Sequence, residues 1–213
     1  DIFATHGLSC TKNFIPNKDI FENKIEEILQ SDLDSKKKKI QIDFLKERFQ
    51  HETKARKRNF RNINSLKKKY KKLDLHDHHE AHAASAYFYS GWSKCYVLTI
   101  DGWGDDASSK LYKANNGKLT QISTSSSIDS LGYFYGSITK LLGFTPHKHE
   151  GKILGLAAYS NPKKAYSDIS KLISYNKITK NFEGNIEKGF YLPSFKNKLL
   201  TFLKKKYKPS EIA

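Results

Sequence analysis

The sequence predicts a fold that mixes helices and strands, of the α/β class with α+β as the alternative. Helical patterns fill much of the first 72 residues, a β-rich run with a hairpin signal follows between residues 95 and 123, and helical patterns return after residue 130. At 213 residues the chain is long enough to bury a core, as one large domain or two small ones. The composition excludes a collagen, a coiled-coil rod and a disulfide scaffold.

The first 75 residues are predicted to be mainly helical. Residues 2–5 fit the end of a short strand. Apolar residues recur on one helical face from Asp19 to Gln30, with Asn17 or Asp19 as the N-cap. A long helical stretch runs to about Lys72, and residues 73–75 fit another short strand.

Positive charge is concentrated in the stretch from Lys36 to Lys72. The chain has a net charge of +16, and this stretch holds 16 Lys and Arg residues against 3 Asp and Glu residues. Such a stretch can bind nucleic acid, but it lacks the glycines that often accompany basic residues in nucleic-acid readers. We therefore favour a solvated helical face and keep nucleic acid as the alternative.

From residue 76 onward the elements are shorter. His79 to Ser90 fits a helix that Gly91 ends. Residues 95–100 fit a strand of the fully buried type that stops at Asp101, and residues 107–113 and 118–123 fit two strands joined by an Asn-Asn-Gly turn. The remaining expectations are a helix at 130–142 ended by Gly143, a loop at 146–152, an apolar segment at 153–159, a helical region opened by Asn161-Pro162, a loop at 182–194 and a basic helix at 195–207.

Two histidines one helical turn apart form a candidate metal site. His78 and His82 are spaced i, i+4, which places both rings on one face of a helix. Metal sites use this spacing when two imidazoles bind one ion, and an oxygen ligand can complete the set. Asp101, at the end of the expected buried strand, can supply that oxygen. The alternative is a group of polar surface residues that cap a helix.

Two further groups can contact phosphate or nucleotide. Residues 101–105 read Asp-Gly-Trp-Gly-Asp, where glycines let backbone N–H groups approach phosphate oxygens and a carboxylate would hold a metal. An ordinary tight turn has the same pattern. Farther along, Lys152 can meet a phosphate and Glu150 a ribose hydroxyl, with a solvated loop as the alternative.

Some chemistries and environments lack support in the sequence. No Ser or Cys lies in a nucleophile motif, so the catalytic residues stay unassigned. The cysteines Cys10 and Cys95 form no metal or redox motif, which favours a reduced, cytoplasmic environment. No apolar run is long enough for a membrane helix, and no targeting segment is visible.

As a set, residues 77–160 resemble the O-carbamoyltransferase family of nodulation and antibiotic-tailoring enzymes. Four blocks carry the resemblance in the family's order: DHHEAHAASAY at 77–87, LTIDGWGD at 98–105, SLGYFY at 130–135 with LGF at 142–144, and EGKILGLAAY at 150–159. The family usually has Glu at position 105, Met at 154 and Gly at 160, where this chain has Asp105, Leu154 and Ser160.

The resemblance implies part of an actin-like ATPase fold, of the ASKHA or RNase H-like kind. Members move a carbamoyl group from carbamoyl phosphate, through carbamoyl-adenylate, to a hydroxyl of a small molecule, with ATP and a divalent iron. Carried over, the metal ligands would be His78, His82 and Asp101, and the phosphate- and nucleotide-binding residues would be Gly102, Gly104, Asp105, Glu150, Gly151 and Lys152. Residues 1–75 would end a first half-domain with a basic helical insertion, and residues 76–213 would form a truncated metal- and phosphate-binding core.

The resemblance also implies an enzyme larger than this chain. A first phosphate hairpin is expected before Asp1, and an adenosine motif and a further aspartate ligand after Ala213. We expect an internal fragment, inactive alone, whose partners are those segments or another chain that supplies them. One alternative is an RNA-modifying relative similar to the tRNA threonylcarbamoyl-adenosine synthase, although that branch favours Ser-Gly-Gly where this chain has Gly-Trp-Gly. The other is a non-catalytic metal- or nucleotide-binding remnant.

Overall fold

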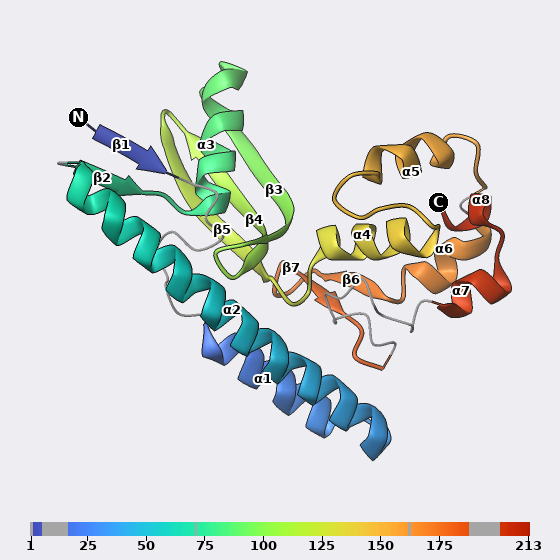
Figure 1. Cartoon of the computed structure of the whole chain (residues 1–213). Coiled ribbons are helices and arrows are strands. Elements are labelled where there is room, and N and C mark those ends of the chain that lie inside the picture. Colours follow the sequence, from blue (N-terminus) through green and yellow to red (C-terminus); the bar gives the residue numbers. More distant parts are fainter. Residues whose placement is uncertain (1, 6–16, 71, 162, 188–200) are drawn as a thin grey trace.

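The computed structural model describes residues 2–5, 17–70, 72–161, 163–187 and 201–213, and it mixes helices and strands as predicted (Figure 1). The elements in chain order are β1 (Ile2–Thr5), α1 (Lys18–Gln30), α2 (Ser35–Lys69), β2 (Lys72–Leu75), α3 (His78–Ser90), β3 (Lys94–Gly104), β4 (Ala107–Asn115), β5 (Lys118–Ser126), α4 (Leu131–Leu141), α5 (Glu150–Ala157), α6 (Lys163–Ile169), β6 (Ile173–Asn176), β7 (Asn181–Gly184), α7 (Thr201–Lys206) and α8 (Pro209–Ile212).

Three small sheets are formed by the described strands. Strands β1 and β2 pair in parallel, β3, β4 and β5 form an antiparallel sheet in that order, and β6 pairs with β7. The hairpin predicted at residues 115–117 is confirmed, because Asn116 and Gly117 both have positive φ angles, of 44° and 84°. Positive φ at both central residues is the geometry that matches the right-handed twist of paired strands.

Helices α1 and α2 lie side by side as a long antiparallel pair (Figure 1). The Asn17 side chain accepts a hydrogen bond from the Asp19 N–H at 3.1 Å, so Asn17 is the N-cap. The shared core of the pair holds Phe21, Ile28 and Leu45. Two buried residues from distant parts of the chain, Ile128 and Ile186, complete it. Residues 36–69 of the basic stretch thus form one continuous helix, whose buried residues are the apolar Leu45 and Ile63 and the polar Gln41, Glu52 and Arg56.

Helix α2 is also tied to the hairpin turn between β3 and β4. The guanidinium of Arg56 makes two hydrogen bonds to the carboxylate of Asp106, one of them at 3.1 Å. Both side chains are buried, with 1% and 8% of their surface exposed. Beside this pair, the guanidinium of Arg48 lies 4.2 Å from the ring centre of Trp103. The helix therefore clamps the turn that follows the glycine-containing end of β3.

Helix α3 covers one face of the three-stranded sheet. Ala83 and Tyr87 pack against Val97, Tyr112 and Ala114. The expectation of a fully buried strand at 95–100 is wrong, because β3 alternates between buried and exposed residues. In an antiparallel sheet alternate side chains point to opposite faces, and the face opposite α3 leaves Tyr96, Leu98 and Ile100 exposed.

The C-terminal elements form a separate hydrophobic cluster around α4. The Ser130 side chain caps α4 by accepting from the Tyr133 N–H, and Gly143 has a φ of 90° just after the helix, as expected of its stop signal. Buried residues of the cluster come from α4, β6 and the last helices: Ile138, Leu141, Leu172, Ile173, Leu203 and Ile212.

Three local expectations in this part differ from the structure. The loop expected through residue 152 ends earlier, because α5 begins at Glu150. The hairpin of β6 and β7 was not predicted, and β7 occupies the start of the expected loop at 182–194. The basic helix expected at 195–207 is observed as α7 over Thr201–Lys206, while residues 195–200 lie outside the described residues.

The described helices include none with the apolar length that a membrane-spanning segment requires.

Candidate metal centre

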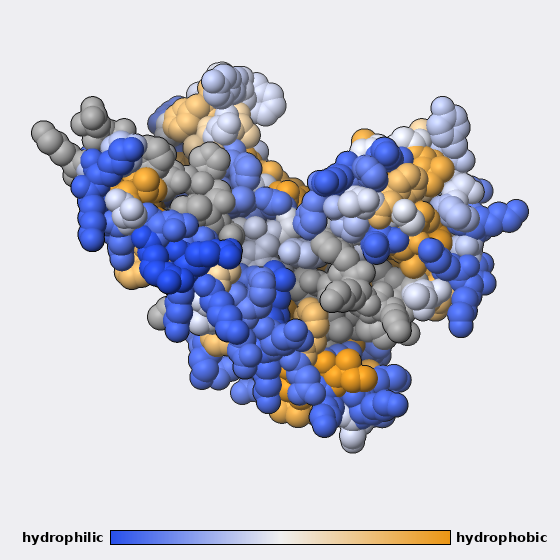
Figure 2. All heavy atoms as spheres, in the orientation of Figure 1, coloured by the Kyte–Doolittle hydropathy of each residue, from blue (hydrophilic) through white to orange (hydrophobic). Residues whose placement is uncertain are grey.

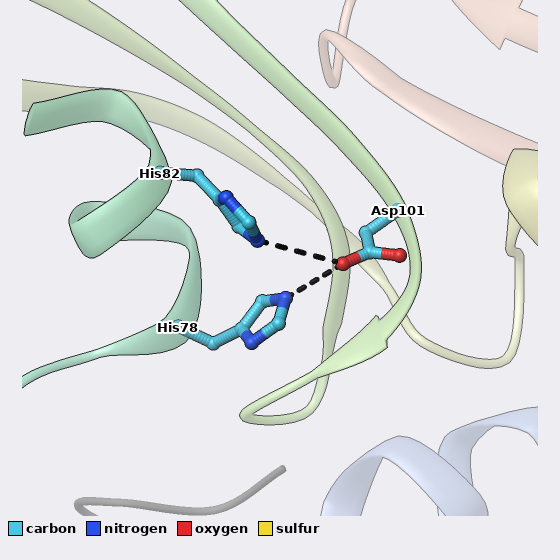
Figure 3. Close-up of side chains that lie close together, drawn as sticks. All are labelled: His78, His82 and Asp101. Carbon is cyan, nitrogen blue, oxygen red and sulfur yellow. Dashed lines mark hydrogen bonds and ion pairs between the residues drawn. The ribbon is translucent and has the colours of Figure 1, made fainter. Parts of the chain in front are cut away.

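His78, His82 and Asp101, predicted as metal ligands, meet in the structure (Figure 3). Nε2 of His78 lies 2.7 Å from Oδ2 of Asp101, and Nε2 of His82 lies 3.7 Å from the same oxygen. The three possible ligand atoms all lie within 4.8 Å of one another. Two side chains from the start of α3 and one from β3 therefore converge on a single point.

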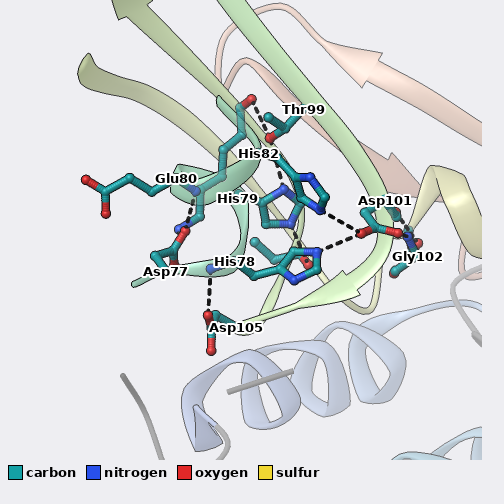
Figure 4. Close-up of polar contacts among 12 residues, drawn as sticks. Asp77, His78, His79, Glu80, His82, Thr99, Asp101, Gly102 and Asp105 are labelled. Atoms are coloured by element: carbon teal, nitrogen blue, oxygen red, sulfur yellow. Dashed lines mark hydrogen bonds and ion pairs between the residues drawn. The ribbon is translucent and has the colours of Figure 1, made fainter. Parts of the chain in front are cut away.

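The start of α3 holds the two histidines in place. Asp77 caps the helix by accepting a hydrogen bond from the Glu80 N–H at 2.9 Å, and its carboxylate also pairs with Lys110 on β4. The carboxylate of Asp105 accepts from the N–H of His78 at 2.8 Å, which joins the helix start to the β3–β4 turn (Figure 4). The helical spacing then places the rings of His78 and His82 edge to face, with their centres 4.6 Å apart.

An irregularity in β3 presents Asp101 to the histidines. The strand does not stop at Asp101 as expected but continues to Gly104, with a shift in its pairing to β4 between Ile100 and Gly104. Such bulges bend a strand and redirect its side chains. The other carboxylate oxygen of Asp101 accepts from the Gly102 N–H at 2.6 Å, and Ser130 donates to the carbonyl of Gly102 at 2.7 Å.

Two glycines provide the space in which the ligands approach. A Cβ atom on Gly104 would lie 2.1 Å from the ring of His78, so no other residue fits beneath that ring. A Cβ on Gly132, in the first turn of α4, would lie 2.5 Å from the backbone oxygen of Asp101. Gly104 was predicted to line phosphates, and the structure places the His78 ring against it. Gly132 was not singled out, because its role comes from packing that no local pattern reveals.

His79 faces the opposite way and is a structural residue. It is fully buried, with Nε2 at 3.2 Å from the carbonyl of Ala107 and Nδ1 at 2.9 Å from the hydroxyl of Thr99. A carbonyl can only accept, so Nε2 carries the proton of the ring. Burial lowers the pKa of His79, which keeps the ring neutral. It anchors the start of α3 to the sheet beneath the metal ligands.

The contact between His78 and Asp101 shifts the pKa of both side chains. The hydrogen bond from His78 lowers the pKa of Asp101 to about 2, against the opposing effect of its partial burial. The same bond, with the charges of Asp101 and Asp105, raises the pKa of His78. Without a metal, the charged forms of His78 and Asp101 therefore stabilise each other.

This ion pair makes the stability of the metal-free protein depend on pH. The raised pKa of His78 means that its contribution is complete below the unfolded value of 6.5 and is lost as pH rises through the folded value. The contribution of Asp101 is present above 3.8 and is lost as pH falls through about 2. With a chelator present, we expect the melting temperature difference between wild type and H78Q to be largest between pH 3.8 and pH 6.5 and to shrink as the pH rises through the raised pKa of His78. A difference that grows as the pH rises above 6.5 in thermal melts would contradict this assignment.

Of the residues predicted to bind phosphate or nucleotide, Gly102, Gly104 and Asp105 adjoin the three ligands, whereas Glu150, Gly151 and Lys152 lie on α5. Tyr133 of α4 contacts both regions. Its ring would lie 3.5 Å from a Cβ on Gly102, and it contacts the ring of His147 at 6.0 Å. The N–H of His147 in turn donates to the carboxylate of Glu150 at 2.7 Å. Sequence reasoning did not single out Tyr133 as a linking residue.

Glu150, Gly151 and Lys152 occupy the first turn of α5, and Gly151 and Lys152 are exposed. The hydroxyl of Tyr135 donates to the carbonyl of Glu150 at 2.8 Å, which fixes this turn against α4. The structure thus brings the three predicted ligands together and leaves the predicted nucleotide residues as a neighbouring group on α5. Asp105 belongs to the ligand end, since it binds the N–H of His78.

The donor set suits a divalent transition metal. Two imidazole nitrogens and one carboxylate oxygen are ligands that iron, zinc and manganese share, and three protein ligands leave positions open for a substrate or another ligand. Metal-bound histidines usually donate their second ring N–H to an acceptor. Nδ1 of His78 is buried and has no hydrogen-bond partner among the described residues. The three ligands therefore fit a metal, and the described residues supply no acceptor for the second ring nitrogen of His78.

Comparison with known proteins places these residues in a family. The sequence model of the family described as "Carbamoyltransferase N-terminus" matches residues 10–203. An uncharacterised protein of Methanocaldococcus jannaschii is 39% identical over 97 residues, which cover 46% of this chain and 19% of that protein. The nodulation protein NolNO of Sinorhizobium fredii is 39% identical over 80 residues, 38% of this chain and 12% of that protein. The matched segments thus span a fifth or less of these relatives.

Proposed function

The chain belongs to the carbamoyltransferase N-terminus family, and from this premise we propose that it carries the metal-binding part of an enzyme that transfers a carbamoyl group. The finer proposal is an O-carbamoyltransferase that takes the group from carbamoyl phosphate, through carbamoyl-adenylate formed with ATP, to a hydroxyl of a small molecule. The convergence of His78, His82 and Asp101 within 4.8 Å is the observation that carries it.

Three residues supply ligand atoms to the proposed centre, and two others hold them in position. His78 and His82 present Nε2 atoms, and Asp101 presents the oxygen that both rings face. A divalent ion held there, with Fe²⁺ favoured by the family resemblance, would supply Lewis-acid polarisation of the carbamoyl oxygens. Asp105 and the neutral His79 hold the start of α3, so the rings of His78 and His82 are already positioned to face Asp101.

We assign phosphate binding to Gly102, Gly104 and Asp105, at the end of β3 and the turn after it. We assign nucleotide binding to Glu150, Gly151 and Lys152, in the first turn of α5. Exposure of Lys152 at the first turn of α5 supports a phosphate contact, because anions are favoured at helix starts. We also propose that the chain forms part of an actin-like fold. In this proposal residues 1–75 end the first half-domain and residues 76–213 form the metal- and phosphate-binding core.

The proposed enzyme needs protein beyond these 213 residues. The matched segments cover 19% and 12% of the lengths of the two relatives compared above. Nδ1 of His78, which has no hydrogen-bond partner among the described residues, and the open metal positions also fit a site that another segment, or a complementing chain, completes. We therefore propose that the chain alone binds metal without turnover.

An assay of carbamoyl phosphate cleavage tests this function. The 213-residue chain, loaded anaerobically with Fe²⁺ and given ATP and carbamoyl phosphate, is expected to release phosphate at the rate of the protein-free blank. The same assay on a chimera in which this chain replaces the matched segment of NolNO is expected to show release that depends on a hydroxyl acceptor and is lost in H82A. Turnover by the 213-residue chain would contradict its proposed inactivity, and full activity of the H82A chimera would support a remnant with no catalytic metal site.

A further inference from the structure

The C-terminal half of α2 displays a row of exposed cations. The exposed basic side chains in this half are Lys54, Lys57, Arg58, Arg61, Lys67, Lys68 and Lys69. No Asp or Glu occurs between residues 53 and 73. At 3.6 residues per turn, five of these cations, at positions 54, 57, 58, 61 and 68, fall within about a third of the helix circumference. They form one face, which we call the basic face.

The buried side of α2 lies directly opposite the basic face. The buried residues of the helix are Gln41, Leu45, Glu52, Arg56 and Ile63. Arg56 and Leu45 fix the helix to the hairpin turn and to α1. The helix is therefore held in one orientation, and Figure 2 shows hydrophilic side chains gathered over it. The cations of the basic face are presented on a rigid support rather than on a flexible tail.

The basic face is not neutralised within the described part of the chain. The ion pairs that α2 makes there use Lys37, Arg48 and Arg56, and none uses a cation of the basic face. Like charges at i, i+3 and i, i+4 repel each other and destabilise a helix. Lys54 with Arg58, and Lys57 with Arg61, are such pairs. An anionic partner would remove this repulsion.

We propose that the basic face binds the phosphate backbone of a nucleic acid. From Lys54 to Lys68 the face extends about 21 Å at 1.5 Å per residue, long enough for several phosphates of one strand. Its residues are Lys and Arg beside the polar Asn62 and Ser65, and the exposed Phe60 of this half lies to one side of the face. The row of apolar side chains that a membrane-surface helix inserts into lipid is therefore missing from the basic face. This composition gives backbone contacts and no reading of base sequence. The earlier preference for a solvated face gives way because the cations share one face that no described acid covers.

Salt dependence of binding tests the proposal independently of carbamoyl transfer. Fluorescence anisotropy of the 213-residue chain with a short random-sequence DNA duplex is expected to give a slope of log K against log salt near −4.5, for about five phosphates. The variant K54Q/K57Q/R58Q/R61Q should bind at least about 100-fold more weakly near 50 mM salt, with a slope near −1. Circular dichroism should show an unchanged fold, because glutamine is a good helix former.

A matched variant removes the same charge elsewhere. K163Q/K177Q/K204Q/K205Q changes four exposed lysines on α6, α7 and the β6–β7 hairpin, and it should bind like the wild type. Equal weakening in both variants would overturn the proposal, since net charge alone would then explain binding. A slope near zero would also overturn it, as would binding to phosphatidylserine vesicles or an acidic polypeptide but not to the duplex.

Discussion

Replacing His78 and His82 together with alanine is expected to abolish stoichiometric metal binding. Both nitrogens of the proposed centre are then removed, and a single carboxylate on a half-exposed side chain remains. Loss of an outer-shell partner alone typically costs about 10–100-fold in metal affinity, so loss of two direct ligands should exceed that. Anaerobic calorimetry with Fe²⁺ near neutral pH, where a bound metal can displace protons from the imidazole nitrogens, measures the effect.

Two single variants separate ligation from general histidine binding. The side chain of His82 is 55% exposed, so H82A should fold normally and still weaken binding strongly. His51, on α2, is 72% exposed and distant in sequence from the centre, and H51A should bind like the wild type. Stoichiometric binding that survives in the double variant would place the metal elsewhere, and equal loss in H82A and H51A would mean unspecific surface binding.

Removing the charge of Arg56 is expected to produce the largest loss of stability in the chain. R56Q leaves the buried carboxylate of Asp106 without its ion-pair partner, and such a loss typically costs about 3–5 kcal/mol. For a chain of this size that corresponds to a fall of roughly 6–20 °C in melting temperature. R56K should also be destabilised, because an ammonium cannot make the two parallel hydrogen bonds.

A neighbouring arginine and a double variant complete this test. Arg58 is exposed, and R58Q should change stability by less than about 0.5 kcal/mol. The double variant R56M/D106N, which no longer buries a lone charge, should recover part of the loss. Urea unfolding followed by circular dichroism gives all the values. Equal stability of R56Q and R58Q would show that the ion pair does not hold α2 to the hairpin turn.

Local sequence signals predicted much of the fold. Helices α1 and α3 and the turn at Asn116 and Gly117 follow from capping residues, stop signals and backbone preferences that act within a few residues. The exposure of Tyr96 and Leu98, by contrast, depends on which face of the sheet α3 covers. An apolar run of six residues cannot reveal whether one or both of its faces are packed.

The candidate site divides in the same way. The i, i+4 spacing places His78 and His82 together because a helix has a fixed geometry. That Asp101 reaches them depends on the irregularity of β3 and on Gly104 and Gly132, whose missing side chains leave room for the ring and the strand. The start of α5 at Glu150 was missed because no side-chain cap marks it.

The sequence by itself determined the mixed fold, the family resemblance, the histidine pair and the concentration of charge in residues 36–72, since all of these are written in neighbouring residues. Only the tertiary structure decided what those residues face. Arg56 meets Asp106 across 50 positions, and His79 turns into the core while His78 and His82 turn to Asp101. The cations of the basic face gather opposite the buried side of α2. The physical reason is that a side chain's partner is chosen by packing between distant segments, which local preferences do not encode.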